Sequence, residues 1–161
     1  MPEETQDIEV VETRSPAGTE RFGRSLADRL RRGDCVALVG DLGAGKTALV
    51  RGIAAGLGLD DRHMVSSPTF VLCQEYPARV VVYHLDLYRM SDPGPELEDL
   101  GLDEMLQEGV VLVEWADRAM DHLPRPLWQV SIAITGPRRR RFQIRRLTHS
   151  APPAEARKES P

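Results

Sequence analysis

Short apolar runs separated by polar turns predict the first elements of the chain. Residues 8–13 combine β-branched and acidic positions, which predicts a strand. Ser15 followed by Pro16 is typical of a helix N-cap and first helical position. The apolar residues that follow recur every four positions and give this helix one face to bury: Phe22, Leu26 and Leu30.

The middle of the chain contains a second strand and helix and then two neighbouring strands. Residues 35–39 predict a buried strand, and residues 46–55 predict a helix. Residues 70–76 and 79–86 are apolar runs on either side of Pro77 and Ala78, which indicates an antiparallel hairpin.

The last part of the chain returns to strands after a short helical stretch. Residues 91–102 open with Ser, Asp, Pro and Gly and then space their leucines, which predicts a short helical segment. Residues 110–114, 128–134 and 142–147 predict three further strands. Alternating strands and helices, together with the hairpin, predict an α/β fold: a three-layer sandwich around a mixed, largely parallel central sheet that includes antiparallel strands.

Length and composition fit one folded domain. The chain has 161 residues, of which 41% are hydrophobic and 29% charged. We expect a single domain over residues 1–148 and a disordered tail over residues 149–161, which are rich in Pro, Ala, Ser and charge. No apolar run approaches the roughly 20 residues of a membrane span, and the acidic N-terminus has no apolar signal core. We therefore expect a cytoplasmic protein without membrane contact.

Charge and cysteine content exclude further classes. The formal net charge of −4 argues against a protein that coats nucleic acid, so we expect no DNA binding, although a local basic patch stays open. Cys35 and Cys73 stand singly within predicted strands, which predicts two core residues rather than a metal or redox pair.

Residues 40–47 read Gly-Asp-Leu-Gly-Ala-Gly-Lys-Thr, a complete G-x-x-x-x-G-K-[ST] phosphate-binding loop between a predicted strand and a predicted helix. Its glycines let backbone N–H groups surround phosphate oxygens, Lys46 reaches the β and γ phosphates, and the Thr47 hydroxyl is a ligand for Mg²⁺. The fold is therefore expected to be that of a P-loop NTPase. The expected nucleotide contacts are Asp41, Leu42, Gly43, Ala44, Gly45, Lys46, Thr47 and Ala48.

Two carboxylates qualify as partners of the metal. Asp86 ends the run at 79–86, and Glu114 ends the run at 110–114, so both are expected at the sheet edge that carries the phosphate-binding loop. One would hold Mg²⁺ directly or through water while the other orients the attacking water. The sequence does not divide these two roles between Asp86 and Glu114.

Three other residues near these motifs allow two interpretations each. His84 is either a catalytic base or a packed, hydrogen-bonded strand residue, and the second interpretation is favoured. Trp115 stacks on a base or a partner surface, or belongs to the core. Thr69, within Ser67–Phe70, is either a hydroxyl that senses the γ-phosphate or part of a Ser-Pro turn.

The missing motifs favour ATP over GTP. The chain contains no asparagine, and no aspartate is followed by glycine three residues later, so it lacks the Asn-Lys-x-Asp and Asp-x-x-Gly motifs of conventional GTPases. A small-molecule kinase remains an alternative, although neither an arginine-bearing lid nor an acceptor pocket is identifiable in the sequence.

The motifs together resemble the TsaE family, also called YjeE, whose members are bacterial ATPases that assist the threonylcarbamoyladenosine modification of tRNA. The resemblance covers roughly residues 8–148 and rests on these segments: Gly40–Thr47, Ser67–Phe70, His84–Arg89 and Val113–Trp115. It implies weak ATP hydrolysis and joint action with TsaB and TsaD, the latter transferring the threonylcarbamoyl group to adenosine 37 of tRNAs that read ANN codons. ATP hydrolysis would then reset the complex between turnovers.

The resemblance also implies roles for individual residues. Lys46 would hold the phosphates as a catalytic residue, Thr47 and Glu114 would be ligands of Mg²⁺, and Asp86 would be the second acidic group. Thr69 would lie in a switch-like segment with a catalytic role. Trp115 would be sensitive to substitution.

The adenine site is implied less directly, between an N-terminal segment and the last hairpin. Ser15, Pro16 and Arg138 would then lie near the base, although Pro137 interrupts the expected turn. The run Arg138–Arg141 has two other interpretations: phosphate contacts to tRNA together with Arg145 and Arg146, or a solvated hairpin tip, which is favoured. Strand alternation would place Arg139 and Arg141 on one face and Arg138 and Arg140 on the other.

Three hypotheses follow from the sequence. The leading one is an Mg²⁺-dependent ATPase subunit of tRNA modification that contacts tRNA through TsaB and TsaD or through a local basic patch. The second is a nucleotide-gated binding module that does not need hydrolysis. The third is the small-molecule kinase.

Overall fold

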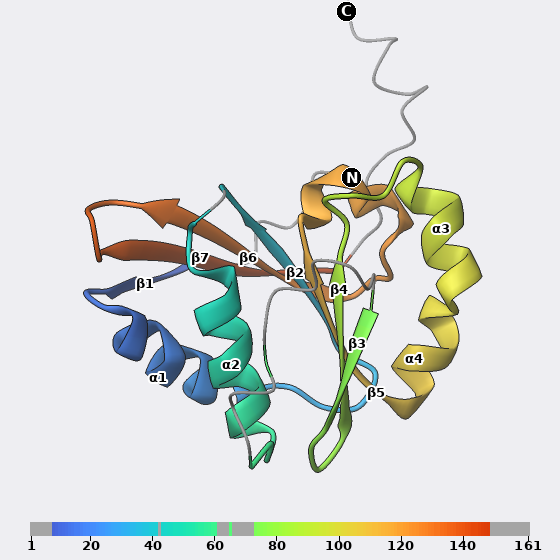
Figure 1. The fold of residues 1–161 in the computed structure, drawn as a ribbon, viewed down its shortest axis with the longest axis horizontal. Coiled ribbons are helices and arrows are strands. Elements are labelled where there is room, and N and C mark those ends of the chain that lie inside the picture. The colour runs from blue at the N-terminus through green and yellow to red at the C-terminus, as the bar shows by residue number, and fades with distance from the viewer. Residues whose placement is uncertain (1–7, 42, 61–64, 66–72, 149–161) are drawn as a thin grey trace, which may run out of the picture.

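The computed structural model describes residues 8–41, 43–60, 65 and 73–148, and its centre is a seven-stranded mixed sheet with helices on both faces (Figure 1). The strand order across the sheet is β1-β7-β6-β2-β5-β4-β3. In chain order the elements are β1 (Glu9–Thr13), α1 (Pro16–Ala27), β2 (Cys35–Gly40), α2 (Lys46–Gly56), β3 (Cys73–Pro77), β4 (Val81–Asp86), α3 (Pro93–Leu100), α4 (Leu102–Glu108), β5 (Gly109–Glu114), the 3-10 helices η2 (Ala116–Arg118) and η3 (Met120–His122), β6 (Leu127–Ile134) and β7 (Arg140–Leu147).

Parallel strands occupy the centre of the sheet. β2 pairs with β5 and β6 in parallel, and β4 pairs with β5 in parallel. The pairs β3–β4, β6–β7 and β1–β7 are antiparallel and lie toward the two edges. All residues of β5 and the first four of β2 are buried, as expected for strands covered on both faces. The predicted mixed α/β sheet is confirmed.

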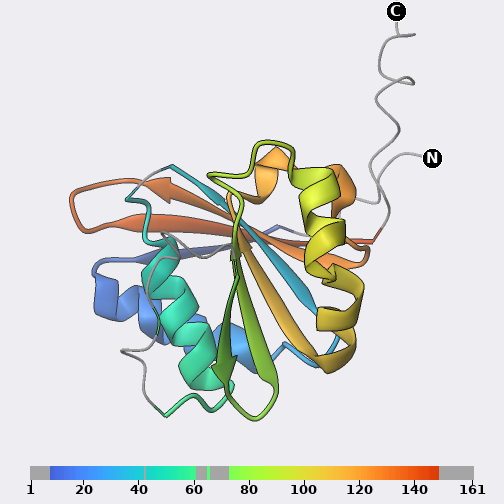
Figure 2. The same cartoon turned by 45° about the vertical axis from the view of Figure 1, so that its right-hand side comes forward.

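The two faces of the sheet carry separate hydrophobic cores, which makes three layers (Figure 2). On one face, α1 and α2 pack through Leu26, Leu49 and Ile53 against the even-numbered residues of the central strands. Glycine at position 52 permits this close approach of the two helices, because a Cβ there would lie only 2.1 Å from the carbonyl oxygen of Glu20. On the other face, α3, α4 and the 3-10 helices cover a second core that includes Leu97 and Met105.

The element boundaries differ from the sequence pattern at several places. α1 ends at Ala27, so buried Leu30 belongs to the connection that follows this helix. The segment at 91–102 is two helices, because Gly101 has a φ of +80° between α3 and α4. β3 includes Pro77, and its expected first residues, 70–72, lie outside the described part, as does the tail from residue 149.

Within the described residues, none of the helices has the length and apolar content that a membrane crossing requires.

Candidate nucleotide-binding site

The phosphate-binding loop connects the end of β2 at Gly40 to the start of α2 at Lys46. Gly43 and Gly45 have φ values of +79° and +98°, in the left-handed region that side chains with a Cβ rarely adopt. Gly45 is the N-cap of α2, and no side chain in the described part of the chain caps this helix. The first N–H groups of α2 therefore have no side-chain cap among the described residues, an arrangement that suits phosphate binding.

Lys46 places a buried cation in this loop. Its side chain is only 6% exposed, and Nζ donates hydrogen bonds to the carbonyl oxygens of Gly40 (2.6 Å) and Asp41 (3.4 Å). Nζ also lies 3.8 Å from the ring centroid of Trp115. Burial lowers the pKa of Lys46, and the nearby carboxylates of Glu114 and Asp86 oppose this shift. A desolvated ammonium whose described partners are carbonyls and a ring fits an anionic ligand.

Asp86 and Glu114 lie side by side at the same edge of the sheet. The strands that they end, β4 and β5, run in parallel, and Asp86 pairs with Glu114 in register. Glu114 also pairs with Leu38 of β2, two residues before the phosphate-binding loop. Burial raises the pKa of Asp86, although the Tyr88 N–H that donates to its Oδ1 (2.9 Å) acts in the opposite direction. The structure thus brings together the two carboxylates and the lysine that the sequence singled out.

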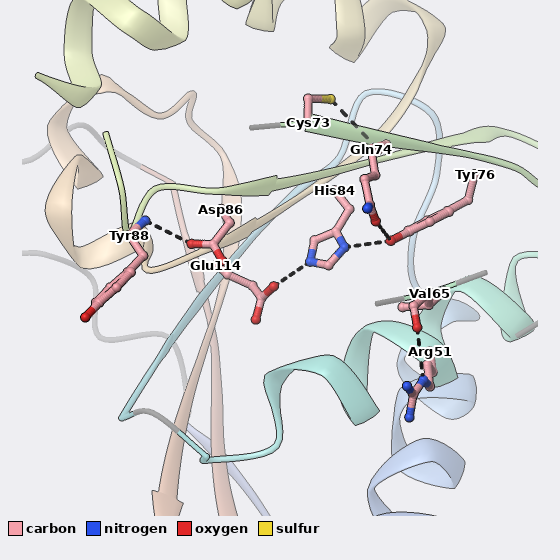
Figure 3. A network of polar contacts seen from close by, with 9 residues as sticks. All are labelled: Arg51, Val65, Cys73, Gln74, Tyr76, His84, Asp86, Tyr88 and Glu114. Carbon is pink, nitrogen blue, oxygen red and sulfur yellow. Dashed lines mark hydrogen bonds and ion pairs between the residues drawn. The ribbon is translucent and has the colours of Figure 1, made fainter. Parts of the chain in front are cut away.

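A chain of buried hydrogen bonds runs from Glu114 to β3 (Figure 3). Glu114 and His84 are 2% and 0% exposed, and Oε2 of Glu114 lies 2.6 Å from Nε2 of His84. Nδ1 of His84 lies 2.9 Å from the Tyr76 hydroxyl, which donates its proton to Oε1 of Gln74. Both ring nitrogens of His84 therefore have a hydrogen-bond partner, and the tautomer of the ring decides which nitrogen donates.

The favoured interpretation of His84, a packed and hydrogen-bonded residue, agrees with its surroundings. The sequence did not show that its partner is the candidate site carboxylate. One signal was present, because His84 and Asp86 are two residues apart on a strand and hence share one face of the sheet. Only the register of β4 against β5 places Glu114 beside them.

Trp115 lies at the site as well as against the core. It follows Glu114 directly and has a φ of 57°, the left-handed region that is rare for a bulky residue. Its ring centroid lies 4.9 Å from that of Tyr88, which is exposed, and Trp115 also packs against the second hydrophobic core. The core interpretation agrees with this packing, and stacking on a base or a partner surface stays a prediction.

A pocket of about 180 Å³ opens between the phosphate-binding loop, α1 and the β6–β7 hairpin. Pro16 and Arg138, two of the residues expected near adenine, line it. Its lining consists of Pro16, Thr19, Gly43, Gly45, Ala48, Pro137, Arg138 and Arg140. Ser15 does not line this pocket: its hydroxyl caps α1 by accepting the Gly18 N–H at 3.0 Å, and it faces a separate groove between β1 and α1.

Most arginines of the last hairpin have partners within the chain. Arg141 pairs with Glu12 (3.1 Å), and Arg145 donates to Gln129 (3.2 Å). Arg146 lies over the ring of Trp128 and 3.9 Å from Asp34. The alternation expected for Arg138–Arg141 does not describe this run, because β7 begins only at Arg140. The favoured interpretation, a solvated hairpin tip, fits Arg138 and Arg139, which are exposed, but not Arg140.

Oxygen ligands suited to Mg²⁺ surround the loop. Thr47 is the second residue of α2, after Lys46, and the carboxylates of Asp86 and Glu114 end neighbouring strands at the same sheet edge. Among the described residues, no three side chains of His, Cys, Asp or Glu are grouped so that they could hold a metal ion by themselves. A metal here would share its coordination with ligand oxygens, as Mg²⁺ does at nucleotide sites. Leu42 and Thr69, both expected at this site, lie outside the described residues.

The phosphate-binding loop, Asp86 and Glu114 all lie within a segment that matches a known protein family. Residues 13–142 match the family model described as threonylcarbamoyl adenosine biosynthesis protein TsaE. The chain is 44% identical over 126 residues to the tRNA threonylcarbamoyladenosine biosynthesis protein TsaE of Bacillus subtilis, with 77% of each chain covered. It is 46% identical over 105 residues to the Streptomyces coelicolor protein of the same name, covering 63% of this chain and 70% of that one.

A solved structure shows the same fold. The crystal structure of Bacillus subtilis YdiB superimposes with a TM-score of 0.70 at 32% sequence identity, covering 89% of this chain and 87% of that chain. The expected P-loop fold class is thereby confirmed.

Proposed function

We propose that this chain, which belongs to the TsaE family, is an Mg²⁺-dependent ATPase that serves the threonylcarbamoyladenosine modification of tRNA. The family model confirms the resemblance noted in the sequence motifs. One observation carries the ATPase assignment: the buried ammonium of Lys46 lies in a complete phosphate-binding loop, at the sheet edge where Asp86 and Glu114 end neighbouring strands.

Each of these residues has a task that its position supports. Lys46 would bind the β and γ phosphates, exchanging its carbonyl partners for phosphate oxygens. Thr47, Asp86 and Glu114 would hold Mg²⁺, which when bound neutralises charge on the phosphate oxygens. Of the two carboxylates, Glu114 is the more buried and is fixed by His84, so it would also orient the attacking water and accept its proton.

The nucleoside end would occupy the pocket beside the hairpin. Pro16 and Arg138 line this pocket together with Gly43, Gly45 and Ala48 of the phosphate-binding loop and α2. A nucleotide that enters it would therefore keep its phosphates at the start of α2. ATP is favoured over GTP because the chain contains no asparagine and hence no Asn-Lys-x-Asp motif.

Family membership supports action together with TsaB and TsaD. We place tRNA on these partners and not on the arginines of β7, since Arg141, Arg145 and Arg146 are already engaged within the chain. Adding the TsaB–TsaD pair to the purified protein should raise its rate of ATP hydrolysis several-fold. Unchanged hydrolysis in the presence of an active pair would contradict this proposal.

Products and repeated turnover separate this function from its alternatives. A small-molecule kinase would pass the γ-phosphate to an acceptor, whereas the proposed ATPase yields only ADP and free phosphate. A nucleotide-gated binding module would support repeated rounds of tRNA modification even when a variant binds ATP without hydrolysing it. If the protein is the proposed ATPase, the same variant would stop after the first round of modification.

A further inference from the structure

Arg140 joins the phosphate-binding loop to the turn between β6 and β7. Its Nε donates to the carbonyl oxygen of Ala44 (3.0 Å), and Nη2 donates to that of Gly43 (3.2 Å). Nη1 donates to the carbonyl oxygens of Gly136 (2.9 Å) and Arg139 (2.8 Å). One guanidinium thus binds four backbone carbonyls on two loops that lie almost a hundred residues apart in the sequence.

These contacts answer a requirement of the loop itself. A phosphate-binding loop turns successive N–H groups inward toward the anion, so its carbonyl groups point outward and need other partners. Arg140 supplies donors to two of these carbonyls, at Gly43 and Ala44. The planar guanidinium can do this with several N–H groups at once, whereas the ammonium of a lysine cannot span the same four acceptors.

Arg140 is itself held firmly. It begins β7, the strand between β1 and β6, and pairs in register with Thr13 on one side and Ile134 on the other. Its side chain also lines the 180 Å³ pocket together with Arg138. The carbonyls of Gly43 and Ala44 therefore accept hydrogen bonds from a residue that is paired on both sides.

We propose that Arg140 is a positioning residue that keeps the phosphate-binding loop in its anion-binding conformation. This role rests on the proposed function for the identity of the ligand alone, which is a nucleoside polyphosphate with Mg²⁺. Arg140 acts through the loop backbone, so its loss weakens the binding of the polyphosphate part whether or not a nucleoside is attached.

Binding of two probes to Arg140→Ala and Arg140→Lys tests this role. We expect the dissociation constants of Mg²⁺–ADP and of Mg²⁺–tripolyphosphate each to rise about tenfold, equivalent to about 1.4 kcal/mol. Arg141→Ala is the matched control, since the neighbouring arginine contacts Glu12 and not the loop, and its affinities should equal those of the unchanged protein. A loss of ADP binding with unchanged tripolyphosphate binding would overturn the proposal, because Arg140 would then serve only the nucleoside end.

Hydrogen exchange provides a readout that needs no ligand. In the nucleotide-free protein, amides at residues 43–47 should exchange faster in Arg140→Ala than in Arg141→Ala, because two loop carbonyls have lost their donor. Equal exchange in the two variants would overturn the role of Arg140. If the unchanged protein bound neither probe, the proposed function would be wrong, and the exchange comparison would still decide about Arg140. Arg140→Lys keeps the exchange test usable if the alanine variant does not fold.

Discussion

Nε2 of His84 lies 2.6 Å from Oε2 of Glu114, and both side chains are buried. A buried carboxylate is costly unless it is paired and hydrogen-bonded, and His84 meets that need while Tyr76 fixes the other ring nitrogen. The Glu114 carboxylate is therefore held in one orientation at the sheet edge that carries the phosphate-binding loop.

Glu114→Gln should lower hydrolysis far more than it weakens nucleotide binding. The amide keeps the shape of the carboxylate but cannot accept a proton from water, so we expect ATP turnover to fall by about 10²-fold or more. Measured without Mg²⁺, where Glu114 holds no metal, the dissociation constant for ADP should change by less than about threefold, an order-of-magnitude expectation for a group that acts mainly in the transition state. Steady-state phosphate release and ADP titration measure the two effects.

The control for this substitution is Glu108→Gln, which makes the same chemical change at the exposed end of α4. Its turnover should equal that of the unchanged protein. Full hydrolysis by the Glu114 variant would exclude this carboxylate from the reaction.

His84→Ala should destabilise the fold because it leaves the Glu114 carboxylate buried without its partner. We expect the free energy of unfolding to fall by about 3 kcal/mol, within the range for breaking a buried pair. Tyr76→Phe removes a neutral hydroxyl one step further away and should cost about 1 kcal/mol. Urea unfolding of both variants gives these values.

A double-mutant cycle isolates the contact itself. His84→Ala should cost less in a Glu114→Gln background than in the unchanged protein, because a neutral amide is cheaper to leave unpaired. Strictly additive effects would show that the two side chains do not stabilise each other.

Trp115 should report on the loop through its fluorescence. Lys46 lies over its ring and must turn toward the phosphates when a nucleotide binds, so we expect ADP to change the indole emission. Trp128 contacts Arg146 near the start of β6, at the end away from the phosphate-binding loop, and serves as the internal control. The ADP response should persist in Trp128→Phe and disappear in Trp115→Phe, and the reverse pattern would refute it.

The two cysteines should resist thiol reagents in the folded protein. Burial raises the pKa of Cys35 to about 12 and that of Cys73 to about 11, so below these values both remain thiols. At pH 8 only about 0.1% of Cys73 would be thiolate, since each pH unit below the pKa lowers the fraction tenfold. Labelling with a disulfide reagent should therefore be slow in buffer and fast in denaturant. Rapid labelling of native Cys35 would contradict its buried placement.

The sequence predicted the parts of this molecule that depend on local patterns. The strand predicted at residues 35–39, the helix from Lys46 and the strand-end positions of Asp86 and Glu114 follow from periodicity, glycine spacing and the common edge of parallel strands. The N-cap role of Ser15 was also local, and the structure places its hydroxyl on the Gly18 N–H.

The contacts that the sequence missed depend on how distant segments meet. Arg140 reaches the carbonyl of Ala44 from 96 residues away, and nothing in the sequence distinguishes it from the preceding Arg138 and Arg139. The break between α3 and α4 is a different case, since Gly101 adopts a left-handed φ that glycine permits but does not require. Tyr76 joins His84 only because β3 and β4 pair as a hairpin in the observed register.

Thr47→Ala should remove the dependence of nucleotide binding on Mg²⁺. Thr47 follows Lys46 in the first turn of α2, where its hydroxyl is the ligand that a phosphate-binding loop supplies to the metal. In the unchanged protein, chelation of Mg²⁺ by EDTA should weaken ADP binding about tenfold or more, an estimate of one lost charge-assisted contact. In Thr47→Ala the affinity should already be low and should change less than about twofold on chelation. Thr148→Ala, an exposed threonine after β7, is the matched control and should respond to EDTA as the unchanged protein does. An undiminished response in Thr47→Ala would show that the metal is held without this hydroxyl, leaving Asp86 and Glu114 as its protein ligands.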